Sequence, residues 1–374
     1  MRLELKKRPE HSRAMAIASP LIAIALTVIF GAILFAVLGY DPAKALYSYF
    51  IEPLTEAWSL EELASKATPL VLIAVGLSVA FLSNTWNIGA EGQYTMGAIF
   101  GSIIPVYFWQ WDSWMVLPAM MVMGMIGGAL YASIPAFLKT RFGTNEILTS
   151  LMLVYVAGFL LDWLVRGPWR DPGGYNFPET RDFSEAAILP PMIGNGAMHW
   201  GAVFAVVAVI VVAFLLGGTL KGFEVKVLGQ AERAGAFAGF SRKKMVYFGF
   251  LLSGAFSGLA GIATVSGTVQ QLQPSISPGY GFTAIIVAFL GRLNPVGILI
   301  AGLMLALTYL GGESAQVTMG ISDKVVRVFQ GMLLFFVLAC DTLILYRVSI
   351  VSGRGKGARP QDPVENLVPA EEAV

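Results

Sequence analysis

Long apolar runs separated by short polar segments dominate the chain. A helix that crosses the hydrocarbon core of a membrane needs about 20 mostly apolar residues. Runs approaching that length lie at 17–38, 68–83, 92–108, 115–138, 147–165, 201–216, 245–266, 282–290, 295–310 and 325–346. The run at 282–290 is short and is followed by Arg292, so we expect a partial or tilted span there. The pattern predicts an all-α polytopic membrane protein with about ten transmembrane helices.

Composition excludes several other classes of protein. Of the 374 residues, 56% are hydrophobic and only 13% are charged, whereas a soluble domain carries about 25% charged residues. The formal net charge of +1 gives no basic field for nucleic acid. One cysteine and two histidines argue against a metal site, and the sequence has no Walker-type phosphate loop and no Ser–His–Asp arrangement. We therefore expect no catalytic residue, no cofactor and no metal.

The distribution of Lys and Arg orients the helices. With ten spans and both termini in the cytoplasm, 18 of the 25 basic residues fall on the cytoplasmic side, as the positive-inside rule requires. Between about eight and ten spans satisfy this argument, provided the number is even. The prediction is a cytoplasmic N-terminus over 1–16, a transmembrane domain over 17–346, and a cytoplasmic, disordered tail over 347–374.

Three connecting segments have distinct patterns. In the outer segment 39–67, apolar residues at helical spacing predict an amphipathic helix; they are Leu46, Tyr47, Phe50 and Ile51. The outer segment 167–199 is rich in Pro, Gly and acidic residues, which is typical of an ordered loop. The inner segment 217–244 contains a stretch, 231–238, that predicts a short helix capped by Gly239. That helix either fits a groove on another protein or is a plain amphipathic connector.

Polar residues within the apolar region are densest between Ser83 and Gln93. Such groups are costly inside a membrane, so this segment either holds a helix joint by hydrogen bonds or lines a solute path. The candidate path residues are Asn84, Asn87, Glu91, Gln93, Asn145 and Gln270. Thr144 or Asn145 is also the candidate N-cap for the following span, and Gln270 meets either a solute or bulk water. Glycines at small-xxx-small spacing, Gly254, Gly258 and Gly261, predict close helix packing.

Five motifs together resemble a known family. They are Thr-Pro-Leu-Val-Leu with the residues that follow at 68–80, Trp-Asn-Ile-Gly-Ala-Glu-Gly-Gln at 86–93, and the segments 144–153, 227–235 and 279–295. Over residues 63–347 the chain resembles permease subunits of bacterial ABC importers. The branch is that of nucleoside and simple-sugar permeases that work with a basic-membrane-lipoprotein type of binding protein, within the branched-chain amino acid/ribose-type permease family. The resemblance implies a type II-like ABC importer permease fold in the bacterial cytoplasmic (inner) membrane.

The resemblance also implies partners and roles. Segment 217–244 corresponds to the coupling region of the family, which places Leu228, Gly229, Gln230, Glu232, Arg233 and Ala234 toward an ATPase. It departs from the usual Asn-Pro pair at Gln230 and Ala231. The implied partners are ABC ATPase subunits, a second related permease subunit and an extracytoplasmic solute-binding lipoprotein, with the solute path between the two permeases. ATP hydrolysis would belong to the ATPase subunits.

The sequence leaves open more than one solute and more than one energy source for transport. A nucleoside is the expected solute, and a simple sugar or a branched-chain amino acid is the alternative, because the binding protein sets most of the specificity in such systems. An ion-coupled secondary transporter, from a different class, should carry buried carboxylates at broken helices. Only Glu91, Glu146 and Asp162 come near that description, so we expect ATP-driven import.

Overall fold

The structure is a computed structural model that describes residues 2–7, 13–194 and 196–351. The chain divides into two compact units, one made of Met1–Leu26 with Phe335–Val374 and the other of Thr27–Leu334. Helices α1 (Arg13–Val37) and α13 (Asp323–Leu345) contribute residues to both units.

The first unit contains a two-stranded ladder that the sequence analysis missed. Strand β1 (Arg2–Lys7) pairs antiparallel with β2 (Tyr346–Val351), so that Arg2 lies opposite Val351 and Lys7 opposite Tyr346. The prediction of a disordered tail from residue 347 is therefore wrong up to residue 351, and residues 352–374 lie outside the described residues. Both segments alternate apolar and polar residues, as strands do, but pairing between the two ends of a chain leaves no local trace in its sequence.

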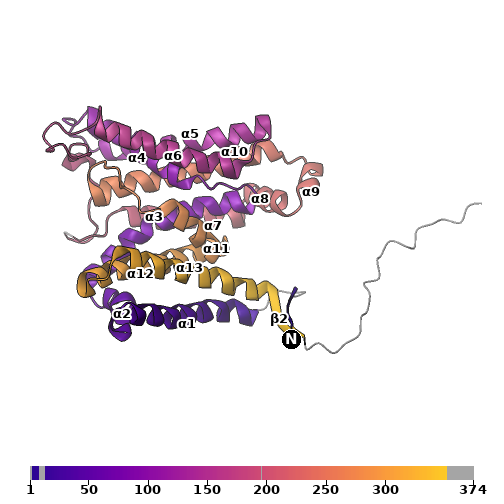
Figure 1. Cartoon of the computed structure of the whole chain (residues 1–374). Coiled ribbons are helices and arrows are strands. Elements are labelled where there is room, and N and C mark those ends of the chain that lie inside the picture. The colour runs from indigo at the N-terminus through magenta and orange to yellow at the C-terminus, as the bar shows by residue number, and fades with distance from the viewer. Residues whose placement is uncertain (1, 8–12, 195, 352–374) are drawn as a thin grey trace, which may run out of the picture. The chain divides into compact units, whose positions relative to one another are not determined.

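The second unit, Thr27–Leu334, is helical (Figure 1). Each predicted apolar run overlaps one helix, although α3 begins 11 residues before the run at 68–83 and α12 ends 9 residues after the run at 295–310. The run at 245–266 continues into a π-helical turn. The further elements are α2 (Pro42–Phe50), η1 (Glu52–Leu54), α3 (Ala57–Leu82), α4 (Ala90–Tyr107), α5 (Val116–Phe142), α6 (Glu146–Arg166), η2 (Glu185–Ala187), α7 (Gly201–Gly218), α8 (Leu220–Gln230), α9 (Glu232–Phe237), α10 (Arg242–Thr264), the π-helical η3 (Val265–Val269), α11 (Tyr280–Leu290) and α12 (Pro295–Met319).

Among the described residues, six helices are long and apolar enough to cross a membrane. They are α3, α5, α6, α7, α10 with η3, and α12. The apolar stretch Ile22–Val37 and α11 are shorter, and α11 matches the partial span expected before Arg292. The helices thus agree with a polytopic membrane protein, while ten crossings and two cytoplasmic termini stay predictions.

The predicted outer segment 39–67 needs a correction. Helix α3 already begins at Ala57, because residues 57–67 are mostly good helix formers and Lys66 pairs with Glu62 at 3.5 Å one turn away. The amphipathic helix exists as α2, but its orientation differs from the prediction. Its buried residues are Ala45, Ser48 and Tyr49, whereas Tyr47 and Ile51 are exposed. The ring of Tyr49 determines this orientation, since it packs edge-on at 4.5 Å against Phe329.

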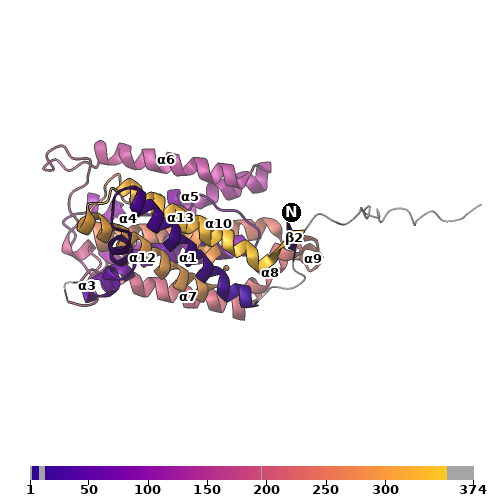
Figure 2. The same ribbon diagram turned by 60° about the horizontal axis from the view of Figure 1, so that its bottom comes forward.

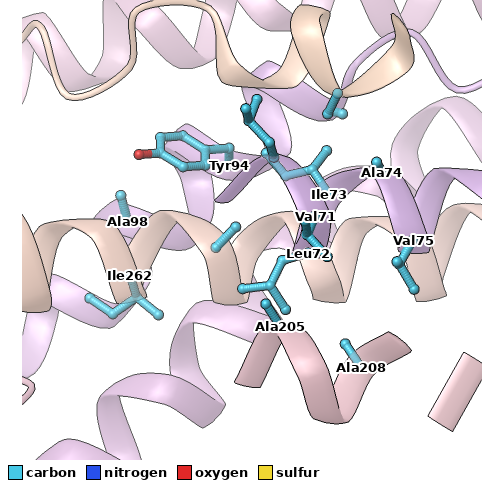
Figure 3. Packing of buried hydrophobic residues seen from close by; sticks show 14 of the residues in the cluster. Val71, Leu72, Ile73, Ala74, Val75, Tyr94, Ala98, Ala205, Ala208 and Ile262 are labelled. Carbon is cyan, nitrogen blue, oxygen red and sulfur yellow. The ribbon is translucent and has the colours of Figure 1, made fainter. Parts of the chain in front are cut away.

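The core is built around α3, which contacts α7, α10, α11 and α12. Figure 3 shows its residues Val71–Val75 beside Ala205 and Ala208 of α7 and Ile262 of α10. In Figure 2, α6 lies at the periphery of the helices of this unit, and only 22% of its apolar window is buried. A membrane helix with so little burial offers most of its surface to lipid or to a partner.

Small residues let α10 approach α4 and α5 closely. A Cβ atom added to Gly258 would lie 2.1 Å from the backbone oxygen of Gly124, and one added to Gly97 would lie 2.1 Å from the Cα atom of Gly258. No side chain fits at such distances. The packing role predicted for the glycine stripe is confirmed.

Candidate functional site

Residues 83–89 join α3 to α4 without helical structure. The backbone of Asn84 is left-handed, with φ of 55°. The guanidinium of Arg242, on α10, donates hydrogen bonds to the backbone oxygens of Ser83 and of Asn84, the latter at 2.7 Å. The exposed Asn84 side chain accepts a bond of 3.0 Å from the indole N–H of Trp86. One cation on a neighbouring helix thus holds the start of this segment.

Two predicted path residues, Asn87 and Gln93, form a buried amide pair. Asn87 Nδ2 donates to Gln93 Oε1 at 2.9 Å, and Gln93 Nε2 donates back to Asn87 Oδ1 at 3.0 Å. Asn87 also donates to Ser253 Oγ at 2.8 Å and accepts from the Gly89 N–H at 3.1 Å. All four hydrogen-bonding positions of the Asn87 amide are therefore used. The arrangement is that of a helix joint held by hydrogen bonds, one of the two interpretations of the sequence.

Glu91 joins α4 to the start of α11. Its Oε2 accepts a hydrogen bond of 2.6 Å from the backbone N–H of Gly281, in the first turn of α11. A carboxylate at a helix N-terminus is stabilised by the unpaired N–H groups there. Gly281 permits the contact, because a Cβ atom at that position would lie 2.3 Å from the backbone nitrogen of Glu91. The first turns of α4 and α11, which are far apart in the sequence, therefore contact each other.

Tyrosines continue this contact toward α12. The Tyr94 hydroxyl donates to the backbone oxygen of Ile276 at 3.2 Å. The Tyr94 and Tyr280 rings lie 6.2 Å apart, and the Tyr280 and Tyr309 rings 5.8 Å apart. Tyr309 shares a 2.8 Å hydrogen bond with Thr283. An aromatic, partly polar band thus runs from α4 through α11 to α12.

The other two predicted path residues lie apart from this cluster. Asn145 is the N-cap of α6, with its Oδ1 accepting from the N–H groups of Ile147 and Leu148 at 2.9 and 3.4 Å. The capping prediction for Asn145 is confirmed. Gln270 directly follows η3, which continues the C-terminal end of α10, and its backbone is left-handed, with φ of 61°.

The segment 167–199 is fixed to the region around Gln270. The Phe183 N–H donates to the Gln270 oxygen at 2.9 Å, and the Thr180 N–H donates to the Leu272 oxygen at 3.0 Å. Ser266 Oγ donates to the oxygen of Ala187 at 2.6 Å. These bonds hold the long segment over the end of α10 and η3.

Helices α8 and α9 form the predicted coupling region, at the end of the unit opposite to α2 (Figure 1). The predicted short helix is confirmed as α9, and Gly239 follows it with φ of 83°. Leu228 is buried, and Gly229 packs so closely that an added Cβ would lie 1.9 Å from the oxygen of Leu82. Gln230 ends α8. The first three predicted coupling residues, Leu228, Gly229 and Gln230, therefore belong to α8, which packs against the end of α3.

The other half of the predicted coupling set is open to a partner. Glu232, Arg233 and Ala234, on α9, are exposed. The side chain of Phe237, also on α9, is 94% exposed. Glu232 also lies 3.9 Å from the Arg242 guanidinium. Because Arg242 holds Ser83 and Asn84, one side chain connects α9 to the non-helical segment.

A cavity of about 490 Å³ opens between the start of α3, η3, Tyr280 and residues 188–191 and 196–199. Its lining includes Trp58, Lys66, His199 and Gln270. Burial lowers the pKa of His199 to about 4, so its imidazole is neutral at pH 7. Its Nδ1 accepts from the Gly201 N–H at 3.1 Å, and its Nε2 lies 3.3 Å from Thr268 Oγ1.

Comparison with known proteins identifies the family. Residues 59–338 match the family described as branched-chain amino acid transport system / permease component. The chain belongs to this family of ABC transporter permeases.

Individual relatives cover nearly the whole permease. A glucose ABC transporter permease protein of Haloferax volcanii is 34% identical, over 97% of this chain and 98% of its own. A nucleoside ABC transporter permease protein of Lactococcus lactis subsp. cremoris is 28% identical, over 87% and 92%. A guanosine ABC transporter permease protein of Bacillus subtilis is 27% identical, over 90% and 96%. The family and the six apolar helices make the chain a multi-pass protein of the inner membrane.

The structure brings together only part of what the sequence singled out. Asn87 and Gln93 pair with each other, Glu91 binds the start of α11 from the first turn of α4, and Asn84 lies in the segment before them. The sequence did not single out Arg242 or Phe237. For Arg242 the reason is that nothing in the run Arg-Lys-Lys at 242–244 distinguishes the first residue from the other two. An aromatic residue within the Ala- and Gly-rich 231–239 segment could have pointed to Phe237. No group of three or more His, Cys, Asp or Glu side chains in the described part of the permease could hold a metal.

Proposed function

We propose that the permease is the membrane-spanning subunit of an ATP-driven importer for nucleosides or simple sugars. The proposal includes ten crossings, both termini in the cytoplasm, and alternating access. The family match supports the transport role. The names of the glucose, nucleoside and guanosine relatives support the class of solute. The proposed partners are ABC ATPase subunits, a second related permease and a solute-binding lipoprotein, and ATP hydrolysis belongs to the ATPase subunits.

The observation that carries the coupling mechanism is the link from Glu232 through Arg242 to Asn84. An ATPase bound to the exposed face of α9 would displace this short helix when ATP closes the ATPase pair. Arg242 sits beside Glu232 and hydrogen-bonds the backbone at Ser83 and Asn84. A displacement of α9 therefore reaches the non-helical segment 83–89.

The same segment is bound to α4, and α4 in turn is bound to the start of α11. Asn87 is locked to Gln93 on α4, and Glu91 holds the first turn of α11. A shift of residues 83–89 would move both helix starts together. In this mechanism Asn84, Asn87, Glu91 and Gln93 transmit motion to the solute path, and Asn145 keeps the start of α6 in place.

Uptake by proteoliposomes tests the proposal. The permease is reconstituted with its genetically adjacent partners and offered radiolabelled guanosine, glucose and leucine, with and without ATP in the ATPase compartment. ATP-dependent accumulation of guanosine or glucose supports the proposal and identifies the solute. Accumulation of leucine alone would contradict the solute class. Uptake that is independent of ATP and depends on a proton or sodium gradient would overturn the ATP-driven mechanism in favour of a secondary transporter.

A further inference from the structure

The cavity beside Gln270 has the dimensions and position of a small-molecule site. Its volume of about 490 Å³ lies within the range of roughly 300–1,000 Å³ that ligand pockets occupy. It opens at the end of the unit opposite to α8 and α9, which is the outer end in the predicted topology. A solute released by an outer binding protein would meet this cavity before the Glu91 joint.

The backbone that forms the cavity edge is unusual in two ways. Helix α10 ends in the π-helical turn η3, and such turns occur often at functional sites. The next residue, Gln270, is a non-glycine residue with φ of 61°. Such a conformation costs free energy and persists only where surrounding contacts hold it. Here the Phe183 N–H bond to the Gln270 oxygen holds the backbone while the side chain stays exposed.

Three lining side chains have hydrogen-bonding groups to offer. In the part of the chain that the structure describes, the Gln270 amide, the Tyr280 hydroxyl and the Trp58 indole N–H make no hydrogen bond. An amide and a hydroxyl each supply both a donor and an acceptor, which is what a pair of sugar hydroxyls needs. Trp58 is 57% exposed and adds an aromatic ring of the kind that lines ligand pockets.

The one lysine that lines the cavity, Lys66, is already paired within the permease. Lys66 lies 2.9 Å from Glu313 and 3.5 Å from Glu62, so two carboxylates already engage its ammonium. His199 is neutral at pH 7, as described above. A phosphate group is normally bound by cationic side chains that are free to form charge-assisted hydrogen bonds. The lining therefore favours an uncharged ligand.

From these features we propose that the cavity is a solute-binding site for a neutral sugar ring with vicinal hydroxyls, either a free sugar or the ribose of a nucleoside. Gln270 and Tyr280 bind the hydroxyls, and Trp58 covers the ring. The inference rests on the proposed import of nucleosides or simple sugars and assigns the residues that hold that solute within the permease.

Protection of an introduced cysteine tests the site. Thr268 is exposed and lines the cavity, so Thr268→Cys is made in a Cys340→Ala background and assembled with the second permease and the ATPases in nanodiscs. A hydrophilic maleimide labels it before any binding protein is added, in the presence of millimolar glucose, guanosine, glucose 6-phosphate or guanosine 5′-monophosphate. Asp112→Cys, an exposed position outside the cavity, is the control label.

Glucose or guanosine should slow the labelling of Thr268→Cys and leave Asp112→Cys unchanged. Whichever of the two protects identifies the source of the sugar ring. Adding Gln270→Ala should raise the protecting concentration about tenfold, the effect of one lost hydrogen bond, whereas Gln273→Ala, which does not line the cavity, should not. Equal protection by the phosphorylated compounds, or protection by neither neutral solute, overturns the proposal.

Uptake by the same variants separates this inference from the proposed function. ATP-dependent uptake without protection would remove the site and leave the importer. Protection without ATP-dependent uptake would leave the site and remove the importer.

Discussion

Asn87 and Gln93 bind each other through both atoms of their side-chain amides, at 2.9 and 3.0 Å. Gln93 lies six positions after Asn87 in the sequence, and the two residues are 1% and 0% exposed, respectively. The pair fixes the non-helical segment 83–89 to the second turn of α4. Asn87 also donates a hydrogen bond to Ser253 of α10. The Asn87 amide therefore joins segment 83–89, α4 and α10.

We predict that the amide pair contributes to stability as a unit. Asn87→Ala leaves the Gln93 amide buried without its partner, and Gln93→Ala does the converse, at about 1–3 kcal/mol each. The double variant should cost clearly less than the sum of the two, since the second change then removes an already unpaired group. Thermal unfolding of the four proteins in detergent, monitored as a double-mutant cycle, measures this. Strictly additive losses would contradict the reciprocal pair.

Replacing Arg242 should uncouple ATP hydrolysis from transport. Arg242→Ala removes the bonds to the Ser83 and Asn84 oxygens, and we expect ATPase activity of the assembled transporter to continue while ATP-dependent uptake falls about tenfold or more. Arg242→Lys should retain part of the uptake, because an ammonium can keep one of the two bonds. Lys243→Ala is the matched control and should transport normally. If uptake and ATPase activity fall in parallel, Arg242 has only a structural role.

Phe237 should anchor the ATPase on α9. A phenylalanine that is 94% exposed on a short helix of otherwise charged and small residues is an expected hot spot, since buried aromatic anchors dominate many interfaces. Phe237→Ala should weaken co-purification of the ATPase by about 2 kcal/mol, or roughly 30-fold in affinity. Phe214→Ala, an exposed position on the apolar helix α7, should have no such effect. Unchanged ATPase association in Phe237→Ala would exclude the anchor.

The double change Glu232→Ala with Arg233→Ala should impair coupling without unfolding the permease. Both side chains are exposed on α9, so the fold loses little, while a docked ATPase loses two charged contacts. ATP-dependent uptake should fall at normal expression and normal thermal stability. Unchanged uptake would remove the coupling role of these two residues.

Acidification should loosen the segment around His199. Its pKa is lowered from 6.5 to about 4 by burial, so between those values the unfolded segment binds a proton that the folded one does not. The resulting stability is complete above pH 6.5 and is lost as the pH falls toward 4, on the order of 3 kcal/mol in total. Hydrogen exchange of residues 188–200, corrected for intrinsic rates, should accelerate at pH 5 relative to pH 7.5. His199→Gln should show a smaller pH dependence; an equal one would assign the effect to other groups.

Local composition and periodicity are enough to predict the class of the protein and most of its helices. Apolar runs of membrane length cannot be satisfied in water, and a helix satisfies its own backbone wherever it forms, so α5, α7 and α12 are visible from local composition. The cap Asn145, the helix α9 and the glycine stripe at Gly258 are also local or periodic features, and the structure contains all three.

Which polar groups meet depends on the packing of the helices and could not be predicted from local patterns. The link between Glu91 and Gly281 joins residues 190 positions apart, and Arg242 reaches Asn84 across 158; no spacing rule connects such positions. The same limit explains the missed β1–β2 ladder and the orientation of α2, which depends on Phe329. Local pattern fixes where helices form, whereas the partners of a polar side chain depend on how those helices pack.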